Sequence, residues 1–121
     1  MKLSTRLVFI FKNFVIKIPI DKRGYLQGKN EKKLWDKYKN SKDLGEIYWE
    51  KFGIVCMKKY NVCNYRIPLY IVDEIKNNII ELNVKNCDLH NYKNWAVKVT
   101  KFHATYVLID YGINETISKM Y

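Results

Sequence analysis

A run of β-branched and aromatic residues, TRLVFIFKNFVIKIPI, occupies most of the first twenty positions of the chain. Residues of this kind favour β-strands, and the polar pair Lys12-Asn13 in the middle of the run is typical of a tight turn. Together with Lys17, this pair also interrupts the apolar stretch, so we expect neither a signal peptide nor a membrane span here. The sequence therefore predicts an antiparallel hairpin near the N-terminus, and the remaining elements must pack around it.

Apolar residues at helical spacing predict two helices after this hairpin. In the segment YLQGKNEKKLWDKYKN, apolar side chains lie among charged ones, and we expect an amphipathic helix that begins near residues 28–30. In the segment IPLYIVDEIKNNIIELN, the apolar residues predict a second helix from about Pro68 to Leu82, with Pro68 in its first turn.

Two more pairs of strands are predicted. One pair consists of LGEIYWEKFG and IVCMKKYN, with a turn at residues 51–53, and the other consists of WAVKV and TYVLID. The resulting order is two strands, a helix, two strands, a helix, a loop and two strands. This order is typical of an α+β fold and not of a doubly wound one. The length of 121 residues predicts a single domain over residues 1–121.

The charge of the chain is strongly positive, with 22 Lys and Arg against 12 Asp and Glu, or a formal net charge of +10. Such a charge favours acidic partners: nucleic acid, nucleotide phosphates or an acidic protein surface. The alternative is solubility combined with the Lys-rich and Asn-rich composition of an AT-rich coding sequence. The lysines are spread along the chain without a dense basic tract, so both interpretations stay open.

The three cysteines, Cys56, Cys63 and Cys87, form no CxxC pair. An odd number at irregular spacing is typical of buried thiols in a reducing compartment, so we expect a cytoplasmic protein. An alternative for Cys87 is a zinc site that it shares with His90 or His103.

Several charged and amide side chains lie within the predicted strands and helices or in the loops next to them, and they are candidates for a functional site. Lys17 lies inside a predicted strand, where burial of its charge requires a partner, and Glu31 on the following helix is a candidate. Asp88 and Asn94 lie in the loop before the last hairpin, and Asp110 ends its second strand. Carboxylate and amide oxygens suit a divalent cation such as Mg²⁺. Two alternatives remain, a solvent-facing lysine on an edge strand and a simple turn at Asp110.

The order of these residues resembles that of protein-kinase-like proteins, and most closely the small bacterial and phage kinase-like proteins. It consists of a strand lysine, a helix glutamate, the segment DLHNYKN and the segment DYG, over residues 8–112. The resemblance implies a kinase-like N-lobe, an antiparallel sheet with one packing helix. It also implies a minimal C-lobe remnant with one helix, a catalytic-loop-like segment and a β-hairpin.

The resemblance further implies how the residues meet ATP. In this family the strand lysine holds the nucleotide phosphates and pairs with the helix glutamate, which are the roles of Lys17 and Glu31. The segment VCMKKYN resembles the connection between the two lobes, where backbone groups near Lys59 and Tyr60 would contact the adenine.

The resemblance also implies a catalytic and metal-binding loop. Asp88 is the counterpart of the catalytic-loop aspartate, and Asn94 and Asp110 are the counterparts of the Mg²⁺ ligands. The sequence departs from the family here, because five residues lie between Asp88 and Asn94 where the family has four. Asn86-Cys87 stand in place of the family's His-Arg.

Other parts of the family's pattern are missing. Too few residues precede Arg6 for a first strand with a glycine-rich loop, and only nine residues follow Gly112, too few for an activation segment and the later C-lobe helices. We therefore expect no efficient protein phosphorylation. We also expect exposed apolar surface that a partner protein covers, or a second copy in a homodimer.

Three functions follow as alternatives. The first is a pseudokinase-type binding or inhibitory module of phage or mobile-element origin, which acts on a host protein in the host-cell cytoplasm. The second is an active ATP- and Mg²⁺-dependent phosphotransferase or nucleotide hydrolase. The third is a basic nucleic-acid-binding protein whose tyrosines stack on bases. We expect no membrane partner.

Overall fold

Six strands and two α-helices make up the part of the chain that the computed structural model describes, which is residues 5–38, 41, 43–82, 89, 91–99, 102 and 104–112. Along the chain they are β1 (Arg6–Ile10), β2 (Phe14–Pro19), α1 (Lys22–Lys37), β3 (Ile47–Lys51), β4 (Ile54–Lys58), α2 (Leu69–Asn78), β5 (Trp95–Val99) and β6 (Ala104–Leu108), with short 3-10 helices at Ile80–Leu82 and Tyr92–Asn94. The α+β class and the order of the elements are confirmed.

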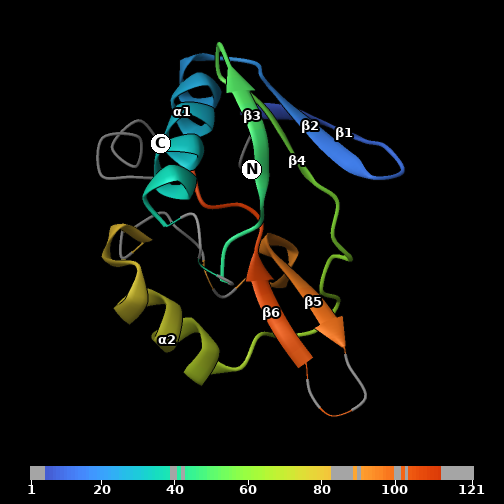
Figure 1. Cartoon of the computed structure of the whole chain (residues 1–121), viewed down its shortest axis with the longest axis vertical. Coiled ribbons are helices and arrows are strands. Elements are labelled where there is room, and N and C mark those ends of the chain that lie inside the picture. The colour runs from blue at the N-terminus through green and yellow to red at the C-terminus, as the bar shows by residue number, and fades with distance from the viewer. Residues whose placement is uncertain are drawn as a thin grey trace.

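The strands form two separate antiparallel sheets. The larger has the order β1-β2-β4-β3, so β2 and β4 are its inner strands, and the smaller consists of β5 and β6. Figure 1 shows α1 beside the larger sheet, with α2 and the β5–β6 hairpin together in the other half of the molecule. The two predicted hairpins of the N-terminal half thus join into one sheet, with β2 paired to β4.

Both turns of the larger sheet lie where the sequence predicts them. The N–H of Phe11 donates to the carbonyl oxygen of Phe14 at 2.9 Å, which places the β1–β2 turn at Lys12-Asn13. Between β3 and β4, Phe52 and Gly53 have positive φ angles of 54° and 81°. Two positive φ angles give a two-residue turn the twist that antiparallel strands require, which is why glycine suits the second position.

Helix α1 begins earlier than the sequence predicts. It starts at Lys22, and not near residues 28–30, because the side chain of Asp21 accepts a hydrogen bond from the N–H of Gly24 at 3.1 Å and caps the first turn. Gly24 and Gly28 are buried inside the helix. A Cβ atom on Gly24 would clash with the backbone oxygen of Thr5, so this glycine serves close packing and does not end the helix.

Helix α2 is shorter than predicted. It runs from Leu69 to Asn78 with Pro68 as its N-cap, and a 3-10 turn covers Ile80–Leu82. The predicted continuation of the α-helix to Leu82 is therefore wrong. Two successive asparagines, which have low helix propensity, stand at the point where the helix ends.

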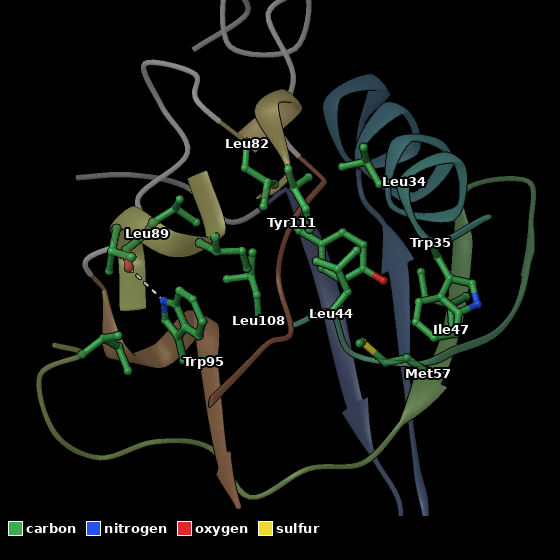
Figure 2. Packing of buried hydrophobic residues seen from close by; sticks show 14 of the residues in the cluster. Leu34, Trp35, Leu44, Ile47, Met57, Leu82, Leu89, Trp95, Leu108 and Tyr111 are labelled. Atoms are coloured by element: carbon green, nitrogen blue, oxygen red, sulfur yellow. Dashed lines mark hydrogen bonds between the residues drawn. The ribbon is translucent and has the colours of Figure 1, made fainter. Parts of the chain in front are cut away.

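One hydrophobic cluster extends from the larger sheet to the smaller one. Figure 2 shows Leu44 and Tyr111 in the middle of it, with Trp95 on one side and Leu34 on the other. The indole N–H of Trp95 donates to the carbonyl oxygen of Leu89 at 2.8 Å, so this buried polar atom is satisfied. The two halves of the fold therefore share their apolar interior.

Backbone hydrogen bonds also join the two halves. The N–H of Gly45 donates to the carbonyl oxygen of Leu108 at 2.8 Å, and the N–H of Leu108 donates to the carbonyl oxygen of Asp43 at 2.8 Å. In addition, the N–H of Cys63, in the segment after β4, donates to the carbonyl oxygen of Trp95 at 2.9 Å. These bonds fix the smaller sheet against the segments that flank β3 and β4.

No helix within the described ranges has the length and apolar character needed to cross a membrane.

Candidate functional site

A pocket of about 480 Å³ opens between the larger sheet and the segment that follows β6. Small-molecule sites in proteins commonly enclose about 300–1,000 Å³, so its size suits a small-molecule ligand. Its wall comes from β1, β2, the end of β4 with the segment after it, and residues 109–110. The lining residues are Val8, Ile10, Val15, Lys17, Met57, Lys58, Lys59, Tyr60, Asn61, Val62, Lys93, Ile109 and Asp110.

The structure brings four of the predicted site residues to this one pocket: Lys17, Lys59, Tyr60 and Asp110. They are distant in sequence and reach the pocket from β2, from the segment after β4 and from the segment after β6. Apolar side chains from β1 and β2 cover one side, and lysines supply most of its charge. The arrangement suits a ligand with an apolar or aromatic part and an anionic part.

Lys17 and Glu31 form the ion pair that the sequence suggested. The Nζ atom of Lys17 lies 3.2 Å from Oε2 of Glu31 and donates to the carbonyl oxygen of Ile109 at 2.7 Å. Lys17 is 7% exposed on an inner strand, so the alternative of a solvent-facing edge lysine is wrong. The ammonium group is thereby fixed between α1 and the segment that follows β6.

Glu31 is fully buried and binds three donors. Besides Lys17, the guanidinium of Arg6 donates to Oε1 at 2.5 Å, and the backbone N–H of Tyr111 donates to Oε2 at 3.2 Å. Burial by itself would raise the pKa of Glu31, but the charges of Arg6 and Lys17 and these hydrogen bonds outweigh it and lower the pKa to about 2. Glu31 is therefore ionised and holds two cations in place.

Arg6 was not among the residues that the sequence indicated. It begins β1, its side chain is 6% exposed, and its Nη2 atom donates to Oδ1 of Asp110 at 3.1 Å. One guanidinium thus connects the buried Glu31 with the pocket-lining Asp110. The available signal in the sequence was a single arginine at the start of an otherwise apolar strand.

The segment after β6 is anchored on α1 around this cluster. Asn30 donates from its amide nitrogen to the carbonyl oxygen of Gly112 at 3.0 Å, and Tyr111 is fully buried. The hydroxyl group of Tyr111 donates to the carbonyl oxygen of Gly45 at 2.8 Å. Burial raises the pKa of Tyr111 above its ordinary value, so this hydroxyl stays protonated. Asp110 therefore belongs to a fixed segment.

Lys59 and Tyr60 line the pocket, but some of their polar groups have partners within the protein. The N–H of Lys59 donates to the carbonyl oxygen of Asn13 at 3.3 Å, and the hydroxyl oxygen of Tyr60 accepts from the N–H of Glu46 at 3.0 Å. Any ligand contact from this segment would use other atoms, such as the carbonyl oxygen of Lys59 or the backbone of Tyr60.

The catalytic and metal residues that the resemblance implied are only partly described. Asp88 lies outside the described residues, as do Cys87, His90 and His103 of the zinc alternative. Asn94 ends the 3-10 helix before β5, where its carbonyl oxygen accepts from the N–H of Ile109 at 2.9 Å. Its neighbour Lys93 lines the pocket.

Asp110, one of the two residues expected to bind Mg²⁺, already has a protein cation beside it. Oδ1 of Asp110 already accepts from Arg6, and a guanidinium this close repels a second cation. Within the described ranges, no three His, Cys, Asp or Glu side chains are grouped so that they could hold a metal ion. The described lining of the pocket therefore carries four lysines, at positions 17, 58, 59 and 93, and one carboxylate, Asp110.

Comparisons of the chain with protein-family models, with curated proteins and with solved structures gave no significant match.

Proposed function

We propose that this protein is a kinase-like nucleotide-binding protein whose pocket takes a phosphate-bearing nucleotide such as ATP. One observation carries the proposal: a single pocket combines Lys17, held by Glu31, with Asp110 and with residues 58–62. The resemblance assigns Lys17, paired with Glu31, to phosphate binding, the backbone near Lys59 and Tyr60 to adenine contact, and Asp110 to a Mg²⁺ ligand. The apolar residues Val8 and Val15 on the same wall would lie against the base.

The charge distribution supports an anionic ligand. Lys17, Lys58, Lys59 and Lys93 line the pocket, and Asp110 is the acidic residue among the lining residues that the structure describes. Because Lys17 is fixed by two partners, it loses little freedom when it binds a phosphate group. The pocket is thus prepared for negative charge before the ligand arrives.

A thermal-unfolding measurement with ATP, in buffers with and without Mg²⁺, tests this proposal. A ligand at 100 times its Kd stabilises the folded state by about 2.7 kcal/mol, which corresponds to a rise in Tm of roughly 10 °C for a chain of this size. We expect this rise for the wild type and its loss in Lys17→Ala. Lys33→Ala, which removes an exposed lysine on the same helix as Glu31, is the control and keeps the rise.

The same samples separate the alternatives. Release or transfer of phosphate from ATP would favour the active phosphotransferase over a pseudokinase-type binding module. Salt-dependent retention on nucleic acid, with no response to ATP in either buffer, would favour the basic nucleic-acid-binding protein and refute the nucleotide proposal.

A role as a binding module for another protein is a second proposal, and the edge strand β1 supports it. Five successive apolar residues, Leu7 to Phe11, are 45–67% exposed on this edge and its turn. Unprotected apolar edge strands tend to pair with other chains. The net charge of +10 disfavours a second copy and favours an acidic partner with an extended apolar segment, such as a host protein if the gene belongs to a phage.

Sedimentation of the wild type and of Phe9→Lys, alone and with an acidic apolar peptide, tests the edge-strand proposal. We expect monomers in both cases and peptide binding to the wild type that Phe9→Lys weakens at least tenfold. A wild-type homodimer that Phe9→Lys dissociates would replace the acidic partner with a second copy.

A further inference from the structure

The guanidinium of Arg6 has a position that the kinase resemblance does not account for. It is buried between Glu31 and Asp110, with Nη1 at 2.5 Å from Oε1 of Glu31 and Nη2 at 3.1 Å from Oδ1 of Asp110. The carboxylate of Asp110 is 46% exposed and borders the pocket, whereas Arg6 is 6% exposed. The positive charge beside the carboxylate of Asp110 is therefore supplied by a side chain of the protein, the guanidinium of Arg6.

Arg6 is held there firmly. An arginine stays charged at all ordinary pH values, and its planar group matches a carboxylate. Its anchor is the ionised Glu31, which itself is fully buried and whose pKa is lowered to about 2. Movement of the Arg6 guanidinium away from Asp110 would disturb its buried ion pair with Glu31, and disruption of a buried ion pair is costly.

A divalent ion on Asp110 would compete with this arrangement. It would share a carboxylate with the guanidinium, at a separation at which two cations repel each other strongly in a partly buried site. Among the described residues that line the pocket, four are lysines and Asp110 is the only acidic one. The pocket supplies positive charge from side chains and offers few oxygen ligands for a metal.

We propose that Arg6 takes the place of a divalent metal ion beside Asp110, so that the pocket binds its phosphate-bearing ligand through protein cations alone. This inference rests on the proposed nucleotide-binding function and specifies it. Lys17 contacts the phosphates, Arg6 neutralises Asp110, and the lysines at positions 58, 59 and 93 balance the remaining charge.

Calorimetric titration with ATP in excess EDTA and in excess Mg²⁺ tests the inference. The wild type is expected to bind ATP with Kd values that agree within about threefold between the two buffers. Asp110→Asn removes a negative charge near the phosphates and should tighten binding about threefold in both buffers. Asp73→Asn, which changes an exposed carboxylate on α2, is the matched control and should leave both Kd values unchanged.

A second measurement follows the metal directly. Retention of Mn²⁺, observed by electron paramagnetic resonance in the presence of ATP, is expected to be no greater with the wild-type protein than with ATP alone. Arg6→Gln should create retention of Mn²⁺ by freeing Asp110. If Arg6→Gln does not fold, the wild type and Asp110→Asn still decide the question.

The outcomes are distinguishable. A gain of tenfold or more in ATP affinity with Mg²⁺, abolished by Asp110→Asn, would overturn the role of Arg6 and leave the nucleotide proposal standing. Absence of ATP binding in both buffers would overturn the nucleotide proposal together with the inference.

Discussion

At the scale of single residues, a buried charge cluster defines the candidate site. Glu31 has no exposed surface, and it is ionised because Arg6, Lys17 and the N–H of Tyr111 all donate to it. Burial of a charged group is costly unless the group is paired and hydrogen-bonded. The carboxylate of Glu31 meets this condition, because two cations and one backbone N–H donate to it. The cluster both fixes Lys17 at the pocket and connects α1 to the segment after β6.

Glu31→Gln is expected to destabilise the protein by about 3–5 kcal/mol at pH 7, because two buried cations lose their counter-charge. The folded-state pKa of Glu31, about 2, lies below its ordinary value of 4.5. Its stabilising contribution is therefore complete above about pH 4.5 and is lost as the pH falls towards 2. The difference in unfolding free energy between wild type and variant should shrink by roughly 3 kcal/mol over that interval.

Urea unfolding at a series of pH values measures this difference. Glu74→Gln, which changes an exposed carboxylate on α2, is the control and should differ from the wild type by less than about 0.5 kcal/mol throughout. A difference between wild type and Glu31→Gln that does not change between pH 5 and pH 2 would contradict an ionised Glu31 in the folded state.

At the scale of elements, α1 is positioned by its glycines as much as by its apolar face. Gly24 packs against the backbone of Thr5, just before β1, and Gly28 packs against Gly53 in the β3–β4 turn. These contacts bring α1 close to one end of the larger sheet, where β1 begins and the β3–β4 turn lies. Glu31 follows one turn after Gly28, so the approach of the helix decides whether its carboxylate reaches Lys17.

Gly28→Ala is expected to reverse the usual effect of this substitution. In an exposed helix interior, alanine is more favourable than glycine by about 1 kcal/mol. At this position a Cβ atom would clash with the carbonyl oxygen of Gly53, so helix and turn must separate, and we expect a loss of about 1–3 kcal/mol. Chemical denaturation measures it, with Lys33→Ala on the exposed face as the control. A stabilised Gly28→Ala variant would show that the contact is loose.

At the scale of the whole molecule, the two sheets share one core and the pocket lies at their junction. Leu108 ends β6, is fully buried, and exchanges backbone hydrogen bonds with Asp43 and Gly45 beside the larger sheet. Figure 2 shows it between Trp95 and Leu44. A contact of this kind should couple the stability of the two halves.

Leu108→Ala is expected to cost about 2–5 kcal/mol, because it removes buried methyl groups and leaves a cavity. If the halves unfold together, tryptophan fluorescence and far-ultraviolet circular dichroism will report the same, lowered midpoint. Leu69→Ala is the control, since Leu69 is 55% exposed and its change should have little effect. Two separate midpoints in the wild type would contradict the prediction of a single domain.

The sequence predicted most of the elements and offered Glu31 as a candidate partner of Lys17, with a solvent-facing lysine as the alternative. Alternating and β-branched runs, together with the turns at Lys12-Asn13 and at Gly53, are local signals, and they placed the strands correctly. The predicted start of α1 near residues 28–30 is too late, because Asp21 caps the helix and the glycines at positions 24 and 28 lie inside it. Their true role depends on the close approach of other segments, which no local pattern reveals.

The sequence by itself determined the α+β class and the hairpins, and it offered Glu31 as a candidate partner for Lys17. Only the tertiary structure decided what Asp110 faces. Arg6 lies 25 positions from Glu31 and 104 positions from Asp110, and the fold brings the three together. The physical reason is that strand and helix signals arise from neighbouring residues, whereas the partner of a buried charge is chosen by packing among segments distant in the chain.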